Sequence, residues 1–168
     1  MTVSMYQASI PVFIRALKNL SAILAKGAAN AAERKIDPSV FVNARLAPDM
    51  FALARQVQIT SDTVKAFAAR VAGVEVPSYE DNETTFEQLE ARIQKTIQFL
   101  ETFKPEQLDG TEEKEVTVPT RSDPDRKFKG EFYLLNWALP NLYFHVTAAY
   151  AILRHNGVPI GKKDFLGA

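Results

Sequence analysis

The sequence predicts an all-α protein, an antiparallel four-helix bundle with a small β-hairpin or loop before its last helix. Three observations support this class. Apolar residues recur at helical spacing in several long segments, capping and proline signals separate these segments, and one short stretch alternates instead. A chain of 168 residues suits a single core, so residues 1–168 are expected to form one domain.

The first helix is expected over residues 6–33. Its apolar side chains recur at alternating steps of three and four, which places them on one buried stripe: Ile10, Phe13, Leu17, Leu20 and Leu24. Gly27 and the alanines after it would let another backbone approach closely. Asp37 precedes Pro38, and a residue before proline resists the helical conformation, so the helix should end before this pair.

The second helix is expected to follow Pro48 and to stop at Gly73, a typical C-terminal residue. The positions predicted to share its buried face are Met50, Leu53, Val57, Val64, Ala68 and Val71. After Val76 the chain should cross to the next helix through a polar segment.

The third helix has the clearest start signal. Thr84 and Thr85 precede Glu87 and Gln88 at the spacing of a capping box, in which side chains satisfy the free amides of the first turn. Its stripe is heptad-like and ends before Lys104–Pro105: Leu89, Ile93, Ile97, Leu100 and Phe103.

A period of two replaces the helical period within residues 108–130, which predicts a small, exposed hairpin. The last helix should run from Phe132 to the Asn156–Gly157 terminus, with a kink or a new helix start at Pro140. Residues 158–168 are expected to form a surface coil.

Composition excludes several function classes. Basic and acidic residues number 20 each, so no net charge attracts nucleic acid, and zero cysteines exclude disulfides and thiolate ligands. Neither a signal peptide nor an apolar run of about 18 residues is evident, so we expect a cytoplasmic protein without a membrane segment. Phosphate loops, nucleotide fingerprints and zinc-protease motifs are also lacking.

His145 is the sharpest candidate for chemistry, because it falls on an otherwise apolar face of the last helix. It is interpreted either as an inward metal ligand or acid–base group, with Asn141 one turn away, or as a core histidine whose hydrogen bonds are satisfied locally. On the second helix Gln56 has the spacing to look inward as well. The alternative is that Gln56 lies on a solvated edge.

Other side chains are pocket candidates. Arg45 could place a guanidinium at the mouth of the bundle to meet a carboxylate ligand, or it could pair with Asp49. Tyr143 belongs to an aromatic group that would line a ligand pocket, form a dimer interface or pack the core. The full group is Phe132, Tyr133, Trp137, Tyr143 and Phe144.

Three motifs resemble those of a bacterial family of unknown function within the DinB/YfiT-like superfamily of metal-dependent four-helix bundles. They are residues 45–51 (RLAPDMF), 143–145 (YFH) and 153–157 (LRHNG), and the resemblance extends over residues 5–166. It implies the bundle fold and often a homodimer. In that superfamily three histidines hold a divalent metal, one from helix two and two, four residues apart, from helix four.

By this resemblance His145 matches the second histidine of the helix-four pair, because Arg154 follows it by nine residues as in the family pattern. Asn141 falls at the first histidine and Gln56 near the helix-two ligand, so amides replace two of the three imidazoles. The implied site for Zn, Ni or Mn is therefore degenerate.

Three hypotheses follow. The first is a DinB-like bundle with a degenerate interior metal or small-ligand site at His145, Asn141 and Gln56. The alternative is a non-catalytic structural or binding homodimer in which the same residues form a buried hydrogen-bond network. The third is an active enzyme that uses Asp49 or Asp62 as replacement ligands.

Overall fold

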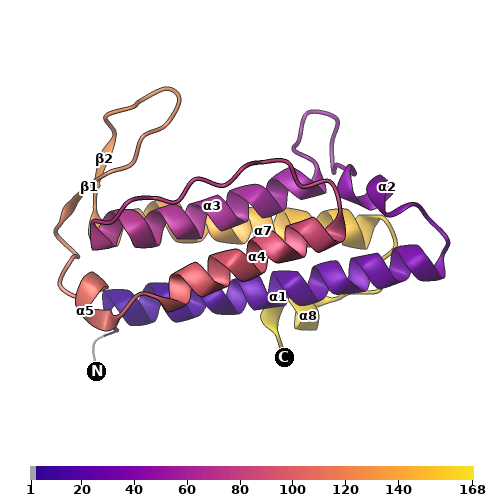
Figure 1. Cartoon of the computed structure of the whole chain (residues 1–168), viewed down its shortest axis with the longest axis horizontal. Coiled ribbons are helices and arrows are strands. Elements are labelled where there is room, and N and C mark those ends of the chain that lie inside the picture. Colours follow the sequence, from indigo (N-terminus) through magenta and orange to yellow (C-terminus); the bar gives the residue numbers. More distant parts are fainter. Residues whose placement is uncertain (1–2) are drawn as a thin grey trace.

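The chain folds into a mostly helical protein with one small antiparallel sheet, as expected. The computed structural model describes residues 3–168. Four long helices lie side by side along the molecule (Figure 1): α1 Met5–Glu33, α3 Leu53–Ala72, α4 Phe86–Glu101 and α7 Leu139–His155. Helices α1 and α3 each pack against both α4 and α7, so the apolar stripes of all four meet in one core.

Short elements connect the long helices. They are α2 Pro38–Val42, α5 Pro105–Leu108, β1 Glu115–Thr117, β2 Lys127–Lys129, α6 Gly130–Tyr133, the π-helix η1 Leu134–Ala138 and α8 Lys162–Leu166. Strands β1 and β2 pair antiparallel, with Val116 opposite Phe128. Gly130 ends this hairpin at a position where a Cβ would lie 2.2 Å from the Thr111 carbonyl oxygen, so only glycine fits.

The predicted helix ends are partly right. The hydroxyl of Thr85 accepts a hydrogen bond from the Gln88 amide at 3.3 Å, as the capping box requires. Gly73 ends α3 with a φ of +77°. The start of α3 was predicted too early, because the chain between α2 and α3 closes a loop in which the Leu53 amide donates to the Ala44 carbonyl at 3.0 Å.

The last helix has a break where proline predicted one. Pro140 has no amide hydrogen to donate, and the helix widens into η1 immediately before α7 begins at Leu139. The expected surface coil after α7 is wrong in part, since it contains α8. This short helix packs through Phe165, whose ring lies 6.4 Å from that of Tyr150.

Close packing at Gly27 has a different cause from the predicted one. A Cβ at this position would lie 3.1 Å from the Leu153 side chain and 3.3 Å from that of Phe86. Side chains of α7 and α4, not a second backbone, therefore use the space that the glycine leaves.

Helix α1 corrects the expectation that the chain has no segment apolar and long enough to span a membrane. Its most apolar stretch has a mean hydropathy of 1.3, so its length and composition would allow it to cross a membrane. Core helices of soluble proteins share these properties, and Phe13, Leu17 and Leu20 of α1 are fully buried against the other helices. The property is therefore weak evidence for a membrane segment.

Candidate functional site

His145 and Gln56 meet inside the protein. Helix α7 carries His145 and α3 carries Gln56, and these two helices pack along each other. The His145 Nδ1 lies 2.7 Å from Gln56 Oε1, while Gln56 Nε2 donates to the Phe51 carbonyl at 3.1 Å. Because this second bond uses the amide nitrogen, Oε1 is the acceptor. His145 must therefore carry a hydrogen on Nδ1.

The other ring nitrogen of His145 has a free lone pair. In the part of the chain that the structure describes, His145 Nε2 has no hydrogen-bond partner. The fully buried side-chain atom without a partner there is Arg92 Nε, so His145 Nε2 must be reached by solvent to some extent. Burial and the nearby positive charge of Arg55 lower the pKa of His145 below its ordinary value. The ring is thus a neutral hydrogen-bond acceptor near pH 7.

Asn141 does not join this pair. Its side-chain amide donates to the Trp137 carbonyl of η1, one turn earlier, at 2.7 Å. No hydrogen bond links it to His145 or Gln56 among residues 3–168. The structure therefore brings together two of the three residues expected to share a site.

The residues present do not fit a divalent metal. A protein-held zinc commonly needs three or four strong nitrogen, sulfur or carboxylate donors. Among the described residues no three His, Cys, Asp or Glu side chains gather closely enough to hold an ion. The Gln56 oxygen, a weak ligand, already accepts the His145 hydrogen.

Asp62 was expected as a pocket residue or replacement ligand, but it belongs to an ion cluster. Its Oδ1 accepts from Arg92 Nη2 at 2.8 Å and from Lys65 Nζ at 2.9 Å. Arg92 also contacts Glu83 at 3.0 Å and Asp81 at 3.1 Å. The Arg92 side chain is only 2% exposed, so α4 carries a buried cation surrounded by carboxylates.

This cluster holds the crossover of residues 74–85 against α3 and α4. The crossover runs along the helices in Figure 1, and Arg92 bonds its Glu80 carbonyl at 3.0 Å. The centroid of the Tyr79 ring lies 3.8 Å from the ammonium nitrogen of Lys65 and 4.1 Å from that of Lys95. Sequence analysis missed the cluster, although an arginine beside Ile93 in a buried stripe was a signal for it.

The remaining candidates lie at the surface. Arg45 donates to the Met50 carbonyl and forms no ion pair with Asp49, which corrects the expected pairing. Asp49 is exposed, and Tyr143 is 43% exposed. None of the three contacts the His145–Gln56 pair through a hydrogen bond in the described residues.

An apolar hollow lies at Phe144, next to His145 in sequence, although His145 itself does not line it. It has a volume of about 390 Å³ and is lined by Leu46, Met50, Tyr143, Phe144, Thr147, Ala148 and Ala151. The Phe144 ring meets the His145 ring edge to face at a centroid distance of 5.2 Å, and Phe144 is 59% exposed. Exposed aromatic and aliphatic side chains of this kind mark a ligand groove or a protein interface.

Comparisons with known proteins agree with the resemblance expected from the sequence. A family model described as "Domain of unknown function (DUF1993)" matches residues 5–166. The chain is also similar to a crystal structure of a DinB family member protein from Shewanella denitrificans, with 41% identity and a TM-score of 0.90. That similarity covers 97% of this chain and 92% of the other. None of the curated proteins matches the chain.

Proposed function

The chain belongs to the DUF1993 family, and from this membership we propose that it is a single-domain, DinB-like antiparallel four-helix bundle that binds a small organic ligand at His145. The ligand takes the place of a divalent metal. One observation carries the proposal: the His145–Gln56 bond holds the ring as the Nδ1–H tautomer and leaves Nε2 free.

The ligand class follows from the surroundings of Nε2. A neutral imidazole nitrogen accepts a hydrogen bond, so the ligand supplies an O–H or N–H donor. The exposed Phe144 ring, which meets the His145 ring edge to face, favours an apolar body. A small aromatic alcohol or amine meets both conditions.

Titration of the protein with p-cresol tests this proposal, because p-cresol has an apolar ring and a single hydroxyl donor. The chain has two histidines, so His155→Gln assigns the ¹⁵N imidazole signals of His145 without ambiguity. We expect p-cresol to shift the Nε2 signal of His145 and toluene, which lacks a donor, to leave it in place. An unchanged His145 signal at saturating p-cresol would overturn the proposal.

A zinc titration tests the absence of a metal. We expect less than one equivalent of Zn²⁺ to bind tightly, and no difference between the wild type and His145→Leu. Stoichiometric zinc that disappears in His145→Leu would overturn this half of the proposal and restore the metal site.

The second candidate function is that of a structural or binding homodimer, favoured by the position of the exposed apolar residues. Four large apolar side chains are 38–59% exposed: Leu46 and Phe51 before α3, and Tyr143 and Phe144 on α7. Leu46, Tyr143 and Phe144 line the same apolar hollow. Interfaces between copies concentrate such aromatic residues at their centres. In this case the His145–Gln56 pair would serve as a buried hydrogen-bond network.

Sedimentation equilibrium of two matched variants tests the dimer. Phe144→Asp places a charge within the apolar patch, whereas Phe132→Asp changes an equally exposed phenylalanine, 51% against 59%, on α6. We expect a dimer that only Phe144→Asp dissociates. A wild-type monomer at micromolar concentration would exclude this candidate.

A further inference from the structure

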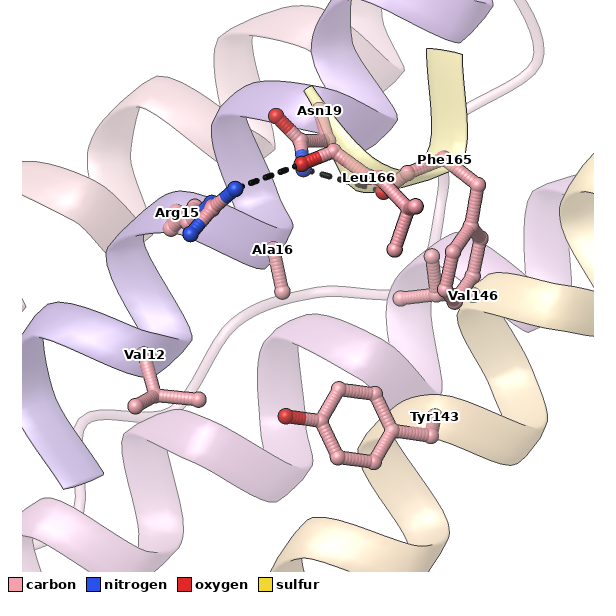
Figure 2. Close-up of a pocket in the computed structure, with 8 residues that line it drawn as sticks. All are labelled: Val12, Arg15, Ala16, Asn19, Tyr143, Val146, Phe165 and Leu166. Carbon is pink, nitrogen blue, oxygen red and sulfur yellow. Dashed lines mark hydrogen bonds between the residues drawn. The ribbon is translucent and has the colours of Figure 1, made fainter. Parts of the chain in front are cut away.

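A second hollow, which shares Tyr143 with the first, opens between α1, α7 and the C-terminal residues. Its volume is about 310 Å³, at the lower end of the range for small-molecule sites, roughly 300–1,000 Å³. Figure 2 shows the residues that line it: Val12, Arg15, Ala16, Asn19, Tyr143, Val146, Phe165 and Leu166. Neither His145 nor Gln56 contributes to its walls.

Two hydrogen bonds from α1 hold the C-terminal wall of this hollow. Arg15 Nη2 donates to the Leu166 carbonyl at 2.8 Å, and Asn19 Nδ2 donates to the Phe165 carbonyl at 3.0 Å. The two bonds join residues that are 151 and 146 positions apart in sequence. The wall is therefore built by tertiary contacts.

The guanidinium of Arg15 keeps unused donors. A guanidinium has five N–H groups, and one of those of Arg15 donates to the Leu166 carbonyl. No carboxylate of residues 3–168 pairs with Arg15. Lys18, one turn away, lines the adjoining hollow and adds positive charge to the same side of α1.

The Tyr143 hydroxyl supplies a second polar group from the opposite wall. Figure 2 shows its phenol ring extending from α7 across the hollow towards α1. Within the described residues this hydroxyl has no hydrogen-bond partner, and the α1 side chains Val12 and Ala16 on the facing wall are apolar. A hollow with one cation, one hydroxyl, the amide of Asn19 and otherwise apolar side chains is complementary to an amphipathic anion.

We propose that this hollow binds a small monocarboxylate with an apolar body. Its carboxylate accepts from the free N–H groups of Arg15 and from the Tyr143 hydroxyl. Its carbon chain lies on Val12, Ala16 and Val146. A single guanidinium with a planar pair of donors matches a carboxylate better than a multiply charged phosphate, because further cations are needed to neutralise the second charge.

Isothermal titration with octanoate tests the site, with octanol as the uncharged control. We expect octanoate to bind at least tenfold more tightly than octanol. Arg15→Gln should weaken octanoate binding tenfold or more, Arg15→Lys should lose less, and Tyr143→Phe should lose about threefold. Lys18→Gln removes the same charge one turn away without touching the hollow and should change binding less than twofold.

Three results would overturn the proposal: no octanoate binding, equal binding of octanol, or equal losses in Arg15→Gln and Lys18→Gln. Circular dichroism of each variant shows whether it is folded, and Arg15 is an exposed residue whose replacement leaves the core intact. His145→Leu should leave octanoate binding unchanged, so this test and the p-cresol test can fail independently.

Discussion

His145 Nδ1 donates to Gln56 Oε1 across 2.7 Å, although 89 residues separate the two in sequence. The bond joins α7 to α3 inside the protein and fixes which imidazole nitrogen carries the hydrogen. Gln56 is itself held by the Phe51 carbonyl, so the loop before α3 takes part in orienting the ring.

Removal of either partner should destabilise the protein. Gln56→Met leaves a buried N–H of His145 without an acceptor, which costs about 1–3 kcal/mol of the free energy of unfolding. Chemical denaturation of Gln56→Met, His145→Leu and the double variant measures the coupling. We expect the double variant to lose less than the sum of the two single losses, and strict additivity would contradict the bond.

Stability should depend on pH through His145. Its pKa in the folded state lies below the ordinary value of 6.5, because burial and Arg55 disfavour the charged ring. Below about pH 6.5 the unfolded chain therefore binds more protons than the folded one, and protons favour unfolding. The contribution is fully present above that pH and is lost as the pH falls towards the folded-state pKa.

The comparison with His145→Gln isolates this effect, since glutamine can donate a hydrogen bond but does not titrate. We expect the stability difference between wild type and variant to change between about pH 7 and pH 5, in favour of the variant at the lower pH. A difference that stays constant would show that His145 has an ordinary pKa.

Arg92 should be the most sensitive charged residue. Arg92→Met leaves the carboxylates of Asp62, Asp81 and Glu83 without their shared cation and releases the Glu80 carbonyl. Breaking a fully buried pair costs about 3–5 kcal/mol. Asp62 and Asp81 are 39% and 40% exposed, so we expect a smaller loss, about 2–4 kcal/mol by urea unfolding.

The exposed pair of Lys127 and Glu115 provides the matched control. Both side chains are more than half exposed, and exposed pairs of this kind contribute roughly 0–1 kcal/mol. Lys127→Met should therefore cost less than 1 kcal/mol by the same estimate. Equal losses for Arg92→Met and Lys127→Met would mean that the crossover is not held by the cluster.

Metal binding should be recoverable by substitution. Gln56→His combined with Asn141→His places two new imidazoles near His145, and histidines four residues apart on a helix share one face. We expect about one equivalent of Zn²⁺ to bind and to raise the melting temperature. Gln58→His with Asn141→His is the control, because Gln58 bonds to Glu83 instead. Similar zinc binding by both pairs would argue against the geometry.

Local signals in the sequence were sufficient for much of the helical structure. The stripe from Ile10 to Leu24 and the Thr85 capping box depend on interactions within a few residues, so their spacing alone predicts them. The same holds for the helix end at Gly73, where a positive φ favours glycine. The family resemblance also predicts that His145 and Gln56 lie near each other.

Only the tertiary structure decided which polar groups meet. Arg92 forms ion pairs with carboxylates of α3 and of the crossover. Arg15 donates a hydrogen bond to the carbonyl of Leu166, which lies 151 residues later in the sequence. Asn141 has the right helical spacing, yet its amide donates to the Trp137 carbonyl in the preceding turn. The sequence by itself determined that four long helices form and roughly where, because their periodicity and caps are local. The folded chain determined the sites, because hydrogen bonds and ion pairs between distant residues depend on how the helices pack.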